Sequence, residues 1–469
     1  MQVFATVLLF SLLQLYINIY EINLYTDVLQ EYMFSGVAEE SQSQQDFYST
    51  VWPPLKDALC GDGTPNLMLA TTLFRLARAE VFSNGNERDH EHGTFAPTRP
   101  VNLDERNFYK RNYTYGMSTF LNQFYSGTFG GGTLFHGKMK RQTGGDGAGR
   151  EFVTLYMKVW KCGNNQIRKL EKQLYRSGSV RGKYSDNGLD HIMARLKSIQ
   201  RQNQNVLPPT CIYTAIRDPI SHFLSGYNEM EYRQLSKDAK PTERLPKKFR
   251  EAPFHREFPY SSDNHELRKR RFQAFVEDVL LEKPVLVSNF IYWHFYPMSR
   301  ILVSLKQHGL KLTGYIPDLA NLTSTWPDFM SSRCPQFLDR DSIPTMRVDG
   351  QHDSSKDRLG LYRAAKDVWA EGGPISRSLC LVHAFDYACF DDLPGGIPVN
   401  PCQSVYRQYA KEIIDYSEEV PIKSNGKVSR KGKGRDWNIP LHKTKNDWRS
   451  PPYLKRMKSS AKEYRLKTT

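Results

Sequence analysis

Two stretches of this chain have the pattern of a strand that ends at a basic residue and continues into a helix. In the first, apolar and polar positions alternate from Phe152 to Trp160 among β-branched and aromatic residues, which predicts a half-buried strand. Ile167, Leu170 and Leu174 then follow at the spacing of one helical face. Lys161 lies in the turn between the predicted strand and the predicted helix.

The second stretch reaches the same arrangement through a different pattern. Cys211 to Ile216 is a short, continuous apolar run, typical of a buried parallel strand, and Arg217 follows at its carboxyl end. Asp218-Pro219 begins a helix, because a proline in the first helical turn needs no N–H group. Ser225 comes eight residues after Arg217 and therefore lies about two turns into that helix.

The remaining patterns complete an α/β protein. We expect a helix over Asn66 to Phe82 and a strand over Lys311 to Ile316. Two further helices are indicated by Phe272-Phe275-Val276-Val279 and by Leu359-Tyr362-Val368-Trp369. Residues 150–410 are enough for one domain with a sizeable core. The predicted architecture is a central parallel sheet flanked by helices.

Turns of this kind hold anions in α/β proteins. The first N–H groups of a helix lack internal partners, and the helix dipole favours negative charge there. Gly163 allows a ligand to approach the backbone closely, and Asn164 can cap the following helix. Lys161 and Arg217 both lie at carboxyl ends of strands, where open α/β sheets bind ligands. Two cationic turns suit a ligand that is anionic at both ends, whereas either turn alone fits a surface lysine or an Arg–Asp ion pair.

Other site chemistries find no support in the sequence. The first turn lacks the G-x-x-x-x-G-K-[ST] spacing, which argues against hydrolysis of a nucleoside triphosphate. No CxxC or HExxH spacing occurs and the twelve histidines are scattered, so we expect no metal site.

Together the two turns resemble the signature pair of sulfotransferases that use 3′-phosphoadenosine 5′-phosphosulfate (PAPS). Val159-Trp160-Lys161-Cys162-Gly163-Asn164-Asn165 resembles the family's 5′-phosphosulfate loop, with Trp160 in place of the usual proline and two asparagines in place of serine or threonine. Arg217-Asp218-Pro219 with Ser225-Gly226-Tyr227 resembles the 3′-phosphate motif, including its spacing.

Later segments are similar to the membrane-bound carbohydrate branch of that family, so that the resemblance covers roughly residues 150–395. These segments are Trp293-His294 with Pro297; Tyr315-Ile316 with Leu319, Asn321-Leu322 and Trp326; His352-Asp353-Ser354-Ser355; and Asp386-Tyr387 with Cys389-Phe390.

The resemblance implies a P-loop-like sulfotransferase fold and transfer of a sulfuryl group from PAPS, the co-substrate, to a hydroxyl or amine of a glycan or polysaccharide. It assigns Lys161 to stabilising the charge that develops as the sulfuryl group leaves. His191, between the two motifs, is the candidate general base, although a lone histidine is more often structural. The implied cofactor-binding residues are Lys161, Gly163, Asn164, Asn165 and Gln166 for the 5′-phosphosulfate, through the backbone amides of residues 163–166, and Arg217 and Ser225 for the 3′-phosphate.

The amino-terminal segment predicts a membrane anchor. Residues 3–20 are largely apolar and as a helix would span about 27 Å, close to the ~30 Å thickness of the hydrocarbon layer. No Lys or Arg precedes Lys56, and acidic residues follow the apolar run, which favours a cytosolic amino end. We therefore expect residues 1–20 to be the signal anchor of a single-pass type II Golgi membrane protein with a lumenal catalytic domain. The sequons at Asn112 and Asn321 fit a lumenal glycoprotein.

The seven cysteines fit an oxidising compartment. Connectivity cannot be deduced from the sequence, but Cys389–Cys402 is the expected disulfide, across a Pro-Gly-Gly turn. Cys162 lies inside the proposed cofactor turn and is expected to be free.

The basic character of the chain belongs to its carboxyl-terminal tail. Residues 421–469 carry a charge of +12 and the whole chain +15, which leaves +3 for residues 1–420. The tail has few apolar residues and is predicted to be disordered. Residues 21–149 are interpreted as a stem that ends in a flexible Gly-rich linker over 127–150, followed by the catalytic domain over 150–410.

Two alternative functions stay open. Trp160 and the paired asparagines allow a non-catalytic lumenal protein that binds anions or glycans on a sulfotransferase-like fold. A basic tail also suits a nucleic-acid binder in the nucleus, but the apolar amino-terminal segment argues against it, and we expect no nucleic-acid partner.

Overall fold

The computed structural model describes residues 43–82, 121, 124–125, 131–139, 151–176, 180–187, 189–235, 260, 263–282, 294–317, 319–334, 357, 359–393 and 395–419. The chain divides after Pro421, and all of the described residues belong to the part before that point. The predicted anchor at 1–20, the sequon at Asn112, the segment 352–355 and the tail at 421–469 lie outside the described residues. Within the described ranges, no helix has the length and apolar content needed to cross a membrane.

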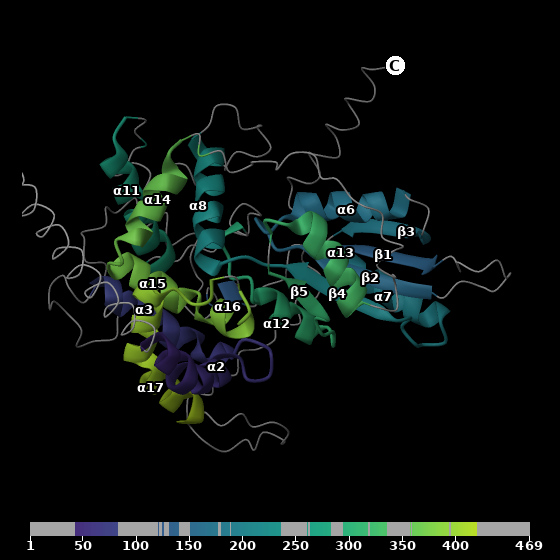
Figure 1. Ribbon diagram of the computed structural model, residues 1–469, viewed down its shortest axis with the longest axis horizontal. Helices are drawn as coiled ribbons and strands as arrows, with labels where there is room; N and C mark the ends of the chain where they lie inside the picture. The colour runs from purple at the N-terminus through teal and green to yellow at the C-terminus, as the bar shows by residue number, and fades with distance from the viewer. Residues whose placement is uncertain are drawn as a thin grey trace, which may run out of the picture. The chain divides into compact units, whose positions relative to one another are not determined.

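A five-stranded mixed sheet organises the part of the chain that carries both turns (Figure 1). Its spatial order is β3-β1-β2-β4-β5. Strands β2, β4 and β5 are parallel, whereas β1 is antiparallel to both of its neighbours, β2 and β3. The strands are β1 (Gly132–Met139), β2 (Glu151–Met157), β3 (Val180–Asn187), β4 (Thr210–Ala215) and β5 (Gly314–Ile316).

The α/β class is therefore confirmed, but the sheet is mixed rather than parallel as predicted. Strand β1 occupies residues that the sequence suggested as a flexible Gly-rich linker. Its eight residues GTLFHGKM alternate positions that pack on opposite faces, with Leu134 in one core and Phe135 in the other. The surrounding glycines hide this short alternation, because glycine weakens every strand signal.

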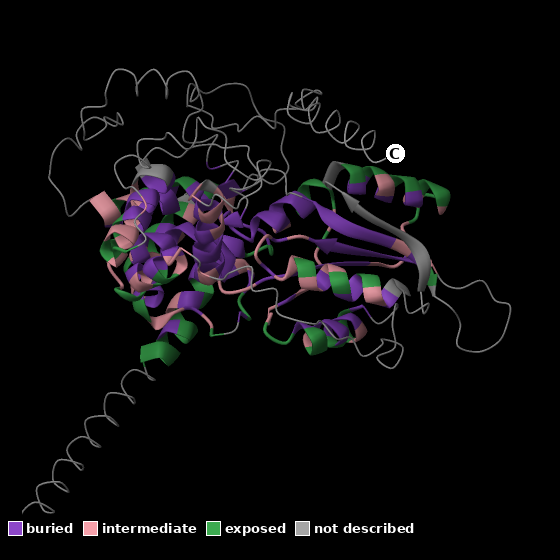
Figure 2. Cartoon of the chain, turned by 90° about the horizontal axis from the view of Figure 1, so that it is seen from above, coloured by how far each residue is buried: buried purple, intermediate pink, exposed green. Residues whose placement is uncertain are grey.

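Helices cover both faces of the sheet. Strand β2 sends Val153, Leu155 and Met157 into one core, together with apolar residues of α7 (Leu189–Gln202). The alternate positions Phe152 and Tyr156 enter a second core with α6 and α13, described below. Strand β2 is thus buried on both faces rather than half-buried as predicted, and Figure 2 shows mostly buried strands between helices that carry exposed positions.

The helices that follow the two turns match the sequence patterns. The helix predicted from Ile167, Leu170 and Leu174 is α6, and all three side chains are buried. The helix predicted at Asp218-Pro219 begins at Pro219. The helices of this part of the chain are α6 (Asn164–Arg176), α8 (Pro219–Leu235), α11 (His265–Ala274) with its π-helical continuation η3 (Phe275–Glu282), α12 (Arg300–Gln307) and α13 (Leu322–Arg333).

A second group of helices brings together the two ends of the described chain. Helix α3 packs on α15, and α2 packs on both α16 and α17, so residues 43–82 share a core with residues 374–419. The predicted stem is therefore in part a structural element of the domain. The elements are η1 (Phe47–Val51), α2 (Trp52–Cys60), η2 (Leu67–Leu69), α3 (Ala70–Phe82), α14 (Leu361–Ala370), α15 (Pro374–Val382), α16 (Ala384–Cys389), η6 (Val399–Gln403) and α17 (Ser404–Glu419).

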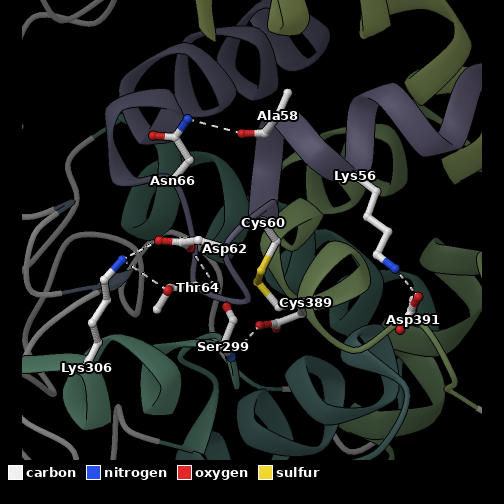
Figure 3. Close-up of a disulfide and its surroundings, with 11 residues drawn as sticks. Lys56, Ala58, Cys60, Asp62, Thr64, Asn66, Ser299, Lys306, Cys389 and Asp391 are labelled. Atoms are coloured by element: carbon white, nitrogen blue, oxygen red, sulfur yellow. Dashed lines mark hydrogen bonds and ion pairs between the residues drawn. A yellow bond between two sulfur atoms is a disulfide. The ribbon is translucent and has the colours of Figure 1, made fainter. Parts of the chain in front are cut away.

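Three disulfides connect the fold, and they differ from the predicted pairing. Cys389 pairs with Cys60 rather than with Cys402, which pairs with Cys380. Figure 3 shows the first of these bonds between α2 and α16, beside the ion pair of Lys56 with Asp391. The prediction failed because Cys389 and Cys402 are neighbours in sequence, whereas packing of α2 on α16 supplies a closer partner. The third disulfide, Cys211–Cys334, ties β4 to the end of α13.

The Cys60–Cys389 bond gives a first prediction. It closes the largest loop of the three, with a separation of 329 residues, and so restricts the unfolded chain strongly. Replacing both cysteines with serine is expected to lower the free energy of unfolding by about 2–4 kcal/mol. Denaturant titration of oxidised protein measures the change. The Cys162→Ser variant is the control for loss of a thiol alone, and equal stability of the double variant and the parent would contradict the prediction.

Candidate functional site

The two turns singled out in the sequence lie side by side. Strands β2 and β4 are parallel neighbours, with Met157 opposite Thr214, so the residues that follow them leave the sheet at the same edge. Two contacts join the turns directly. The Arg217 guanidinium approaches the carbonyl oxygen of Lys161 at 3.5 Å, and the His222 ring nitrogen Nε2 lies 2.8 Å from the carbonyl oxygen of Trp160. Lys161 and Arg217 therefore follow neighbouring strands at one sheet edge, and their joint role in one site stays a prediction.

The first turn is shaped by two left-handed residues. Lys161 and Gly163 have φ of 64° and 69°, and the Cys162 N–H donates to the carbonyl of Val159. At Gly163 a Cβ atom would come within 2.7 Å of Leu322 Cδ1, so both the conformation and the close packing favour glycine there. This places the amino-terminal end of α13, including the exposed sequon residue Asn321, beside the turn.

Helix α6 begins one residue earlier than expected, and this changes the roles of two predicted phosphate-binding residues. The N–H groups of Gln166 and Ile167 both donate to the carbonyl of Gly163, so the Gln166 amide is used inside the helix. In this conformation the Gln166 N–H already has a backbone partner, and its role at the 5′-phosphate stays a prediction. Asn164 is the first helical residue rather than the cap, and its side-chain Oδ1 accepts a hydrogen bond from the Tyr156 hydroxyl at 2.6 Å. Asn165 is exposed at the same helix end.

The Lys161 side chain lies in an ion-pair network with α8. Its Nζ is 2.7 Å from Glu229 Oε2, and the other oxygen of Glu229 accepts from Arg233 at 2.6 Å. Burial lowers the pKa of Lys161, and the Glu229 carboxylate opposes that effect. For Glu229, burial raises the pKa, but the Lys161 and Arg233 charges outweigh it and bring the pKa to about 2.

The second turn is held by Asp218. Its carboxylate accepts from the Ser221 N–H at 2.6 Å and from the Tyr387 hydroxyl at 3.2 Å, which fixes the start of α8 against α16. Ser225 is 4% exposed and lies about 9 Å along the axis from Pro219, at 1.5 Å rise per residue. Ser225 and Glu229 are four residues apart and share a face of α8, so Ser225 lies on the side that contacts the first turn.

Close packing fixes α8 against the segment around His294. A Cβ atom on Gly226 would come within 2.3 Å of the His294 carbonyl oxygen, so this residue of the 3′-phosphate-like motif makes a contact that only glycine permits. The His294 ring lies 4.9 Å from the Trp160 ring, and the indole Nε1 of Trp160 is buried without a hydrogen-bond partner among the described residues. His294 and Trp160 thus border the Lys161 network.

Two buried groups near the first turn, the His222 imidazole and the Cys162 thiol, carry no charge. Burial lowers the pKa of His222 to about 3, so this imidazole is neutral when it contacts the Trp160 carbonyl. Burial raises the pKa of the Cys162 thiol to about 12, and its Sγ lies 3.7 Å from Met298 Sδ. Cys162 is free, as predicted, and its protonated thiol is a packing group rather than a nucleophile.

Asp386 anchors the residues behind the second turn. Burial raises its pKa, but hydrogen bonds from His383 and from the Ser299 backbone outweigh that effect and leave the pKa below its usual range. The Ser299 N–H donates to Asp386 Oδ1 at 2.7 Å, which links the segment after His294 to α16. Of the later segments that resemble the carbohydrate branch, those around His294 and around Asp386-Tyr387 contact the two turns.

His191 is not part of this network. It is exposed near the start of α7, and no contact among the described residues joins it to Lys161 or Arg217. The register nevertheless puts it at the same sheet edge, because Asn187 pairs with Gly132 and Gly132 with Met157. Two strand spacings, about 10 Å, separate β3 from β2. His191 remains a prediction as the base.

Sequence reasoning missed two residues that the fold brings to Lys161, Glu229 and Arg233, and named His294 only within a segment of family resemblance. Glu229 and Arg233 follow Ser225 at helical spacing, so a projection of α8 would have placed them on its face. Within the described residues, no cluster of His, Cys, Asp or Glu has the geometry to hold a metal ion. Comparison of the chain with family models, curated proteins and solved structures gave no match.

Proposed function

We propose that this protein is a PAPS-dependent sulfotransferase that acts on a carbohydrate or polysaccharide. The observation that carries the proposal is the meeting of Lys161 and Arg217 on adjacent parallel strands, each beside the start of a helix. Such an edge offers backbone N–H groups and two cations to one doubly anionic ligand. The proposal includes the P-loop-like sulfotransferase fold.

The reaction needs little covalent chemistry from the protein. As the sulfuryl group passes to the acceptor hydroxyl, negative charge grows on the oxygen that links it to the 5′-phosphate. The Lys161 ammonium lies at the turn where this oxygen would be held, and the left-handed Gly163 shapes that turn. Arg217 and Ser225 would bind the 3′-phosphate, and His191 would take the proton of the acceptor.

The setting of the enzyme follows from the same resemblance. We propose a type II Golgi membrane protein that is anchored by residues 1–20, with a glycan acceptor in the lumen. The exposed sequon at Asn321 and the three disulfides are compatible with a lumenal domain.

Binding of 3′,5′-ADP, the desulfated product, tests the clamp. We expect the Arg217→Ala variant to bind 3′,5′-ADP about 10- to 100-fold more weakly, because it loses charged hydrogen bonds worth about 1.5–3 kcal/mol. Its affinity for 5′-AMP should stay unchanged, since the lost contact is to the 3′-phosphate. Calorimetric titration measures both ligands.

Arg363→Ala is the matched control, because Arg363 is an exposed arginine on α14. An equal loss of affinity for both nucleotides in Arg217→Ala would contradict the 3′-phosphate assignment. No binding by the parent protein would refute the proposed function itself.

One observation favours the non-catalytic alternative. Lys161 is already paired with Glu229, and an ammonium held by a carboxylate stabilises a departing group less than a free ammonium does. A screen of labelled sulfate transfer from PAPS across desulfated polysaccharides separates the two functions. Binding of 3′,5′-ADP without transfer to any acceptor would favour the binding protein.

A further inference from the structure

One face of α8 is aligned with the first turn. Ser225, Glu229 and Arg233 follow one another at intervals of four residues, which places them in a row along the helix. The middle residue of the row makes the ion pair with Lys161. Helix α8, which follows the second turn, therefore also binds the Lys161 side chain of the first turn.

The geometry of the ion pair is well defined. The two side chains are only 12% and 14% exposed, with Nζ of Lys161 at 2.7 Å from Oε2 of Glu229. The second carboxylate oxygen is 2.6 Å from Nε of Arg233 and 2.5 Å from its Nη2. Each oxygen of Glu229 thus has its own cation, so the carboxylate cannot turn away from Lys161 without losing a partner.

The other charges around Lys161 favour loss of its proton, so its positive charge depends on Glu229. Arg217 from the second turn and Arg233 from α8 both act, with burial, against the charged form of Lys161. His294 is the further titratable group close enough to act on Glu229. Among the described residues, Glu229 supplies the negative charge that balances these influences. A buried lysine beside two arginines without a carboxylate would release its proton readily.

We propose that Glu229 is a positioning residue of the transfer site: its carboxylate keeps the Lys161 ammonium charged and fixed at the turn, and Arg233 holds the carboxylate in place. The part of this inference that concerns sulfuryl transfer rests on the proposed function. The part that concerns the charge of Lys161 does not, since the ion pair exists without any ligand.

The charge of Lys161 is measured first. Nuclear magnetic resonance of the full-length chain with ¹³C-labelled lysine follows the Cε signal of Lys161 against pH, and Lys161→Arg identifies that signal by its loss. We expect Glu229→Gln to lower the pKa of Lys161 by at least about one unit. Glu229→Asp, which keeps the charge, should preserve most of the original value.

Glu266→Gln is the matched control, because Glu266 is an exposed carboxylate that pairs with Lys269 on α11. It should leave the Lys161 titration unchanged. An unchanged pKa of Lys161 in a folded Glu229→Gln protein would overturn the inference.

Transfer activity is measured second. We expect Glu229→Gln to lower kcat about tenfold or more at alkaline pH, where its Lys161 has lost the proton, and to recover as the pH falls. A merely structural role would lower kcat equally at every pH. In the Lys161→Arg background the same change should leave the pH profile unaltered, since arginine stays charged.

Failure of the proposed function and failure of the role proposed for Glu229 would give different results. Absence of transfer by the parent protein would refute the proposed function, and the lysine titration would still decide whether Glu229 controls the charge of Lys161. A lowered pKa of Lys161 together with a pH-independent loss of kcat would overturn the positioning role in transfer.

Discussion

Replacing Lys161 with alanine is expected to lower the rate of sulfuryl transfer by about a hundred- to a thousandfold, the usual effect of removing one preorganised charge from a transition state. Binding of 3′,5′-ADP should weaken far less, because the 3′-phosphate is assigned to Arg217 and Ser225. The substitution should leave the backbone conformation of the turn unchanged. Alanine and lysine both carry a Cβ atom at the left-handed φ of 64°, so the strain of the turn is unaltered.

Two further variants make this result specific. Lys161→Met keeps the length of the side chain without its charge and should behave like Lys161→Ala. Lys161→Arg keeps the charge and should retain part of the rate. Single-turnover kinetics with PAPS measures transfer, and calorimetry measures 3′,5′-ADP binding. If Lys161→Met transferred at the parental rate, Lys161 would have no part in the chemistry, and the non-catalytic alternative would gain support.

The local sequence patterns predicted much of what positions the site. The strand, turn and helix around Lys161 and those around Arg217 were each readable, because buried strands and amphipathic helices have different periods. The parallel pairing of β2 with β4 agrees with the predicted position of both cations at strand carboxyl ends, although the pairing itself was not predicted. Cys162 was rightly expected to be free, since it lies within a turn that the fold packs closely.

What escaped prediction depends on residues distant in sequence. The Cys60–Cys389 bond joins segments whose proximity arises from packing of α2 on α16, and no local pattern reports it. Strand β1 was hidden by its glycines. Glu229 carried no motif, and its importance appears only when α8 is placed beside the first turn. The exact start of α6, where the Gln166 N–H donates to the Gly163 carbonyl, lies beside the left-handed Gly163.

Helix α8, which carries Ser225 and Glu229, is itself fixed by a buried ion pair. Arg271 of α11 donates through Nε and Nη2 to the same oxygen of Glu231, at 2.9 and 2.6 Å. Both side chains are almost fully buried, at 1% and 0% exposure. The other oxygen of Glu231 has no hydrogen-bond partner among the described residues, so its desolvation is incompletely compensated.

Replacing Arg271 with alanine is therefore expected to lower the free energy of unfolding by about 3–5 kcal/mol, because it leaves Glu231 charged and unpaired in the core. Burial already raises the pKa of Glu231, and loss of the Arg271 charge would raise it further. A carboxyl with a higher pKa in the folded than in the unfolded state destabilises the fold when ionised. The stability deficit of Arg271→Ala should thus shrink as the pH falls through the folded-state pKa.

The double variant Glu231→Leu with Arg271→Met separates lost charge from lost packing. Apolar residues of similar volume often replace a buried ion pair at no cost or with a gain of about 1–4 kcal/mol, so the double variant should match or exceed the parent. Denaturant titrations at acid and neutral pH measure all three proteins. A double variant as unstable as Arg271→Ala at every pH would show that shape, rather than charge balance, is what this pair contributes to holding α8 against α11.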